Sequence, residues 1–156
     1  MKLFLLKITL ALLLFAGVAS SCNPDPEKEY PQNISFTEYS LTDPSCRWVN
    51  LPYDENVLVI NSYEELGKYI SCEENSFPVI DFSKNSLLLA SGKTLGGICE
   101  KKAKKLVLSS PDKYVLSIEI TIDRSLYISE PWCITFLAEK MNKKNVFELD
   151  LTYLPQ

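Results

Sequence analysis

Apolar and polar residues alternate with a period of two along most of the chain after Ile34. Such alternation is typical of strands with one buried face. It is clearest over residues 114–122, where one face carries Leu116, Ile118, Ile120 and Ile122. Alternation or short apolar runs predict further strands at 34–41, 57–60, 79–82, 86–91, 98–109, 132–137 and 146–154.

A single helix interrupts this pattern. Ser62 and Glu65 have the spacing of a capping box, in which a hydroxyl and a carboxylate bind the first free N–H groups of a helix. Side chains at spacings of three and four follow, at Tyr63, Leu66, Tyr69 and Ile70. We therefore expect a helix at about residues 62–71 in an α+β fold made mainly of antiparallel β-sheet.

The N-terminus has the pattern of a secretory signal peptide. Lys2 and Lys7 precede or interrupt an apolar segment at 8–18, and Ala19, Ser20 and Ser21 then lead to Cys22. The segment is shorter than the roughly 17–25 residues of a transmembrane helix. Three small residues before a cysteine resemble the lipobox of bacterial lipoproteins, which implies cleavage before Cys22 and acylation of its thiol. The alternative is ordinary cleavage that leaves Cys22 as a half-cystine.

These features divide the chain into three parts. Residues 1–21 are the predicted lipoprotein signal peptide, 22–33 the lipidated cysteine with a flexible linker, and 34–156 a single β-rich domain. The linker is rich in proline and acidic residues and has little apolar surface to bury. Acidic residues after the lipidated cysteine resemble the surface-export signal of Bacteroidota lipoproteins. The expected location is the outer membrane of a bacterial cell envelope, where the domain faces either the periplasm or the cell surface.

Composition excludes several classes of function. The chain has 16 basic and 20 acidic residues, and removing Lys2 and Lys7 with the signal leaves 14 against 20, a net charge of −6. Nucleic-acid binding is therefore not expected. Histidine is absent, which excludes Ser-His-Asp and Cys-His catalysis and His-ligated zinc. We expect no enzyme, metal or cofactor, although nominal carboxylates for acid–base chemistry exist at Asp81, Glu119 and Glu130.

Four cysteines follow Cys22 in the chain. An even number in an oxidising compartment predicts two disulfides. The preferred pairing is Cys46–Cys72 with Cys99–Cys133, and the two other connectivities stay open.

Two features suggest binding surfaces. Gly92, Gly96 and Gly97 predict a loop that presents Lys93, Thr94 and Leu95 to a partner, with nearby lysines of 101–105 at the rim. The alternative is that the glycines only permit a tight connection and the lysines only keep a strand soluble. Trp48, Trp132 and eight tyrosines could form a glycan platform, or fill the core.

The order of three motifs resembles the C-terminal domain of the PrcB component of a bacterial protease complex. In that family a Ser-x-Glu-Glu-Leu helix precedes an Asp-Phe-Ser-Lys strand end and a Thr-Gly-Gly-Tyr turn before a long hairpin. The matching segments here are residues 62–66, 81–84 and 95–98, although Leu95 and Ile98 replace the threonine and tyrosine. The resemblance covers about residues 57–153, and the whole chain also resembles small lipoproteins of gut Bacteroidota.

This resemblance implies a non-enzymatic domain that binds or stabilises another protein. The leading expectation is therefore a membrane-anchored lipoprotein, facing the periplasm or the cell surface, that binds a protein partner. A glycan-binding surface module is the alternative.

The lipid anchor can be tested with one substitution. Cys22→Ala removes the thiol that would be acylated at the predicted lipobox, so the protein should lose fatty-acid labelling and enter the soluble extract. Cys99→Ala, a control, should keep both properties. Unchanged labelling and membrane retention of Cys22→Ala would contradict the anchor.

Overall fold

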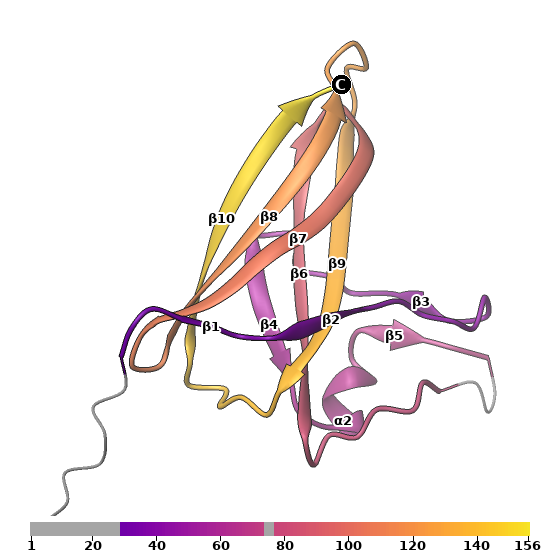
Figure 1. The fold of residues 1–156 in the computed structure, drawn as a ribbon. Coiled ribbons are helices and arrows are strands. Elements are labelled where there is room, and N and C mark those ends of the chain that lie inside the picture. The colour runs from indigo at the N-terminus through magenta and orange to yellow at the C-terminus, as the bar shows by residue number, and fades with distance from the viewer. Residues whose placement is uncertain (1–28, 74–76) are drawn as a thin grey trace, which may run out of the picture.

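The computed structural model describes residues 29–73 and 77–156. The predicted signal peptide, Cys22 and most of the predicted linker lie outside these residues. The described elements are shown in Figure 1: β1 (Gln32–Asn33), β2 (Phe36–Tyr39), β3 (Arg47–Trp48), β4 (Asn56–Ile60), α2 (Tyr63–Leu66), β5 (Ile70–Ser71), β6 (Asn85–Leu95), β7 (Gly97–Ser110), β8 (Lys113–Asp123), β9 (Ser129–Glu139) and β10 (Val146–Pro155).

Two four-stranded sheets face each other. Their strand orders are β1-β7-β8-β10 and β2-β9-β6-β4, and a small sheet pairs β3 with β5. β7 runs beside β9 and β10 runs beside β4, so the two sheets approach each other along both sides. The described strand pairs are antiparallel, as predicted, except that β10 pairs with β8 in parallel. The parallel pair arises because β9 crosses to the opposite sheet before the chain returns.

The main core lies between the two sheets. The alternating face of β8 meets buried residues of the opposite sheet, as its sequence pattern predicts. These residues include Leu88, Ala90, Trp132, Ile134 and Phe136. Each fully buried large apolar side chain stabilises the fold by about 1.5–3 kcal/mol relative to its exposed state.

A second core covers the outer face of β6. Leu87 and Leu89 point away from the main core and are fully buried beneath Leu66 of α2 and Ile70 of β5. Strand β6 is therefore buried on both faces, which explains the nearly unbroken apolar run over residues 87–90.

The helix is shorter than predicted. The Ser62 hydroxyl accepts the Glu65 N–H at 3.2 Å, as expected, but the Glu65 carboxylate accepts the Asn61 N–H at 2.8 Å rather than that of Ser62. The expected helix at 62–71 ends at Leu66 because Ile70 pairs with Trp48 in the β3–β5 sheet. The domain is thus mainly antiparallel β-sheet with one short helix, as predicted, although that helix is a single turn.

Three further boundaries differ from the predictions. Residues 79–82 form no strand, and Tyr63 instead holds this segment through two hydrogen bonds with the Ile80 backbone. The predicted linker ends early, because Gln32 already pairs with Leu108 of β7. The predicted glycine loop is mostly strand: β6 continues to Leu95, and Gly96 alone, at φ 117°, connects it to β7 in the other sheet.

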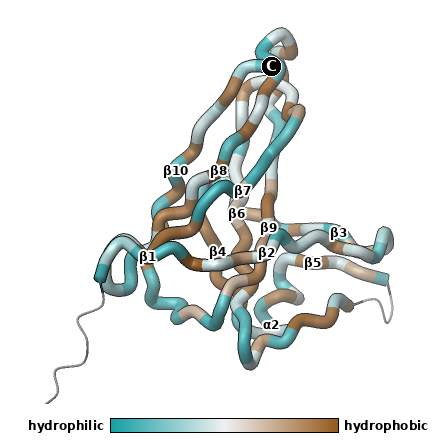
Figure 2. Tube along the Cα trace, viewed as in Figure 1, coloured by the Kyte–Doolittle hydropathy of each residue, from teal (hydrophilic) through white to brown (hydrophobic). Residues whose placement is uncertain are grey.

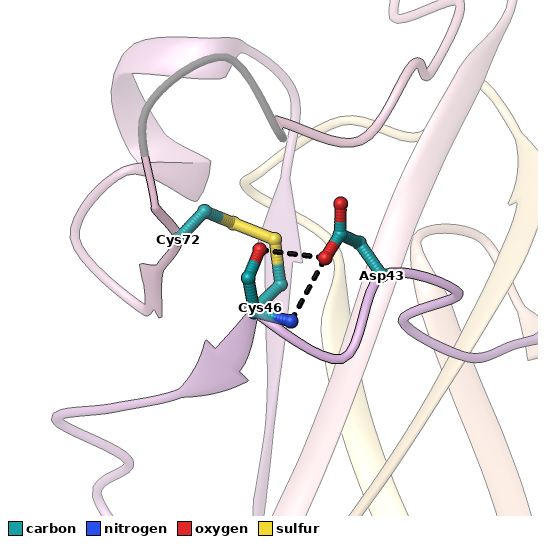
Figure 3. Close-up of a disulfide and its surroundings, with 4 residues drawn as sticks. Asp43, Cys46 and Cys72 are labelled. Atoms are coloured by element: carbon teal, nitrogen blue, oxygen red, sulfur yellow. Dashed lines mark hydrogen bonds between the residues drawn. A yellow bond between two sulfur atoms is a disulfide. The ribbon is translucent and has the colours of Figure 1, made fainter.

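Only one of the two predicted disulfides forms. Cys46 and Cys72 are bonded, and the turn at Asp43 that leads into Cys46 is shown in Figure 3. Closing a loop across 26 residues stabilises the fold by about 3.5 kcal/mol in the chain-entropy account. The predicted Cys99–Cys133 bond is wrong, since both are free thiols. Cys133 packs against the second core, while Cys99 lies on the opposite sheet beside Gln156.

Gly92 provides a test of the packing between the sheets. It lies opposite Trp132, and an added Cβ would be 2.7 Å from Cζ2 of the buried indole. We expect Gly92→Ala to lower the free energy of unfolding by about 1–3 kcal/mol, measured by denaturant titration.

Gly67→Ala is the matched control, because an added Cβ would lie 3.4 Å from its nearest neighbour, the Tyr63 carbonyl oxygen, and its φ is −59°. That variant should be neutral or more stable. A Gly92→Ala protein as stable as the wild type would contradict the tight contact with Trp132.

Candidate functional site

The long strands converge at one narrow end of the molecule, which we call the tip (Figure 1). The tip comprises residues 93–97 at the β6–β7 corner, residues 122–129 at the β8–β9 connection, and the nearby side chains of Glu55 and Tyr153. These residues surround an open pocket of about 760 Å³. A pocket of this size accommodates several side chains or a small ligand.

The rim of the pocket is unusually apolar for a surface. Tyr127 is 100% exposed and Leu95 is 81% exposed, while Leu126 and Ile128 are each 48% exposed. Three consecutive exposed apolar residues in a connecting segment increase the risk of aggregation unless they serve a purpose. The arrangement is typical of a binding surface.

Hydrogen bonds hold the β8–β9 connection in place. The Asp123 carboxylate accepts the Ser125 N–H at 2.8 Å and the Ser125 hydroxyl at 2.6 Å. The Gly96 N–H donates to the Ile128 carbonyl at 2.9 Å. The apolar rim is therefore presented by an ordered backbone, which reduces the entropy that binding would cost.

The Asp123 turn depends on the charge of its carboxylate. Hydrogen bonds from the Ser125 hydroxyl and N–H lower the pKa of Asp123 below its ordinary value of 3.8. A carboxylate whose pKa is lowered by folding stabilises the folded state above its unfolded pKa. This contribution to stability is lost only as the pH falls through the lowered pKa of Asp123, so it is fully present at neutral pH.

Polar groups form the floor of the pocket. The Tyr153 hydroxyl donates to the Glu55 carboxylate at 3.2 Å, and burial and then the neighbouring carboxylate raise the pKa of Tyr153. Glu55 has φ 56°, in the left-handed region that costs energy for a residue with a side chain. The chain thus adopts an uncommon backbone conformation where it places this carboxylate under the pocket.

Two cations at the pocket are available to a ligand. Lys93 lies 5.6 Å from the centre of the Tyr53 ring, and Arg124 begins the β8–β9 connection. Within residues 29–73 and 77–156, neither forms an ion pair with a carboxylate. The nearby acids are engaged, since Glu55 binds Tyr153 and Glu130 accepts the Ile98 N–H at 2.7 Å.

The structure separates the nominal catalytic carboxylates. Asp81 accepts two hydrogen bonds from Ser83, Glu119 pairs with Lys104 at 2.8 Å, and Glu130 binds the backbone. They form no carboxylate pair. Among the described residues, no cluster of three or more Cys, Asp or Glu side chains has the arrangement of a metal site.

The partly buried thiol of Cys133 has low reactivity. Burial raises its pKa from 9.0 to about 12, and nearby Lys101 offsets only part of the rise. Because the thiolate is the nucleophilic form, Cys133 is unreactive at neutral pH.

The predicted contact residues fall at the tip, but in a different arrangement. All three line the pocket, but Lys93 and Leu95 are exposed whereas Thr94 is only 7% exposed. Strand alternation explains this difference, since neighbouring residues of β6 point to opposite faces. Whether Lys93 and Leu95 touch a partner stays a prediction.

Sequence reasoning missed the other half of the tip. The run Leu126, Tyr127 and Ile128, placed just after a turn-forming Asp-Arg-Ser segment, is the signal that could have revealed it. The lysine cluster lies along the hydrophilic length of β7 (Figure 2), and none of its residues lines the pocket. Trp132 is buried and Trp48 packs on the second core, as their core interpretation predicts.

Comparisons with protein families, curated proteins and solved structures found no match to the chain. The resemblance to the PrcB C-terminal domain therefore stays a prediction. No helix within the described part of the chain has the length and hydropathy of a membrane span.

The state of the cysteines can be measured directly. Native protein at pH 7.5 should react with iodoacetamide at the exposed Cys99 and leave Cys133, which is only partly exposed and has a raised pKa, unmodified. In the denatured but unreduced protein, Cys133 should also be alkylated. Cys46 and Cys72 should be alkylated only after reduction of their disulfide.

Peptide mass mapping measures the alkylation of each cysteine. Cys99→Ser is the control, because it should abolish alkylation of the native protein within the described domain. Protection of both Cys99 and Cys133 in the denatured, unreduced protein would indicate a second disulfide and contradict the free thiols.

Proposed function

We propose that the protein is a lipoprotein anchored in the bacterial outer membrane through Cys22, and that its non-catalytic domain binds a protein partner through the tip. The observation that supports this most strongly is the ordered, exposed apolar rim of Leu95, Leu126, Tyr127 and Ile128 around an open pocket. Apolar side chains of this kind form the buried centre of protein interfaces.

The position of the tip fits an anchored binding domain. The chain enters the domain at β1, where Gln32 pairs with Leu108 near the far end of β7. Gly97, at the tip, is eleven residues away along that strand, which corresponds to about 36 Å. A domain tethered by its N-terminus therefore extends its apolar end away from the point of attachment.

Strand addition at β4 is a less suitable way to bind a partner. The exposed edge of β4 is partly closed, because Asn56 Oδ1 accepts the Val57 N–H at 2.7 Å and Glu65 accepts the N–H of Asn61. Capped edge groups are a common protection against pairing with other chains.

The character of the rim favours protein over glycan. Three of its four apolar residues are aliphatic, so they offer neither an aromatic face nor hydrogen bonds to sugar hydroxyls. Among these four rim residues, Tyr127 has the ring that a sugar could stack on, while Tyr153 inside the pocket is bound to Glu55.

The proposal is tested with the double variant Leu95→Ser/Tyr127→Ser. Both side chains are more than four-fifths exposed, so the fold should be retained, while co-purification of a partner from native membranes should fall at least fivefold. The readout is the quantitative mass spectrometry of captured proteins.

The matched control is Val79→Ser/Val146→Ser, which removes two exposed apolar residues away from the tip. This control should capture the partner like the wild type. Equal capture of the partner by both double variants would contradict the proposal. So would a Leu95→Ser/Tyr127→Ser variant that loses binding to a glycan array but still captures the protein partner.

A further inference from the structure

We propose that the segment bound by the tip is an acidic, apolar stretch of a protein, whose carboxylates pair with Lys93 and Arg124 while its apolar side chains enter the pocket. This inference rests on the proposed function and specifies the chemistry of the partner.

The charge at the tip is the first argument. Lys93 and Arg124 have no carboxylate ion-pair partner within the described residues, although the chain carries more acids than bases. Some lysines outside the tip do pair with carboxylates, as at Lys104 with Glu119, Lys113 with Glu148 and Lys143 with Glu65. Among the residues that line the pocket, these two cations face a single carboxylate, that of Glu55.

The described acids near the pocket keep their negative charge, but hydrogen bonds from neutral groups hold them in place, and they form no ion pair with Lys93 or Arg124. Glu55 lies on the floor with Tyr153, Glu130 caps the Ile98 N–H, and Asp123 caps the Ser125 turn. Each carboxylate is therefore engaged in holding the tip together. A ligand carboxylate next to Arg124 would gain a charge-assisted hydrogen bond, which an apolar surround strengthens.

The shape of the tip is the second argument. A pocket of about 760 Å³ next to the rim can accept inserted side chains, with Ile122 and Tyr153 among its walls. Apolar contact would supply most of the affinity, and the two cations would select the segment and its orientation. A membrane surface could cover the rim but could not place residues in this pocket.

The experiment uses the full chain in phosphatidylcholine nanodiscs and a random library of 12-residue displayed peptides, depleted first on empty nanodiscs. We expect enriched peptides to combine Asp or Glu with Leu, Ile or Phe. Their affinities are then measured by fluorescence anisotropy on the wild type and on Lys93→Glu/Arg124→Glu, where we expect at least tenfold weaker binding.

Lys102→Glu/Lys105→Glu is the matched control, because it makes the same charge change on exposed residues of β7, away from the pocket. It should change affinity less than twofold. Peptides with Asn or Gln in place of their acids should bind the wild type at least tenfold more weakly, and should not weaken further on the charge-reversed tip.

Several results would overturn the inference: no enrichment, enrichment of neutral or basic peptides, or affinity that is indifferent to Lys93→Glu/Arg124→Glu. Binding of the tip to added anionic vesicles in place of peptides would indicate a membrane surface and would also overturn it. If Leu95→Ser/Tyr127→Ser abolishes partner capture while acidity has no effect, only this inference fails. If that variant captures the partner normally, the proposed function fails.

Discussion

Strand β6 must be buried on both faces, and most of the domain is arranged to satisfy that requirement. Leu88 and Ala90 face the main core between the sheets, while Leu87 and Leu89 face the opposite side. A single sheet packed against β6 would leave the second pair exposed to water, at a cost of about 1.5–3 kcal/mol for each large side chain. The turn of helix, the β3–β5 sheet and the Cys46–Cys72 disulfide cover that second face.

The same strand produces the tip where its burial ends. At Gly92 the indole of Trp132 takes the space that a side chain would occupy, and after it Lys93 and Leu95 emerge into solvent. Gly96 then turns the chain into the other sheet, and its N–H binds Ile128. The apolar rim is thus attached to the most buried strand of the molecule, which makes it a rigid support for binding.

The sequence predicted those features that depend on local pattern. Alternation identified β8 and β10 almost to the residue, and the spacing of Ser62 and Glu65 identified the start of the helix. The preferred Cys46–Cys72 pairing was also correct.

The features that were missed depend on contacts between distant segments. The helix ends early because Ile70 pairs with Trp48 in the β3–β5 sheet. Strand β10 pairs with β8 in parallel because β9, which lies between them in the chain, belongs to the opposite sheet. Cys99 and Cys133 stay apart because their strands belong to different sheets, which no spacing along the chain reveals. Only half of the tip was predicted, for the same reason. The glycines marked one of its segments, but only the fold brings Leu126, Tyr127 and Ile128 beside that segment.

The most direct test of the account is to ask what touches the tip in living cells. A photoreactive phenylalanine analogue placed at position 127, which is fully exposed, reports contacts within a few ångströms, and the same analogue at position 146 reports the opposite end of the molecule. A tip that binds a protein partner should give one discrete protein adduct from position 127 and none from position 146. Adducts of equal yield from both positions, or adducts only with lipid or glycan at 127, would contradict it.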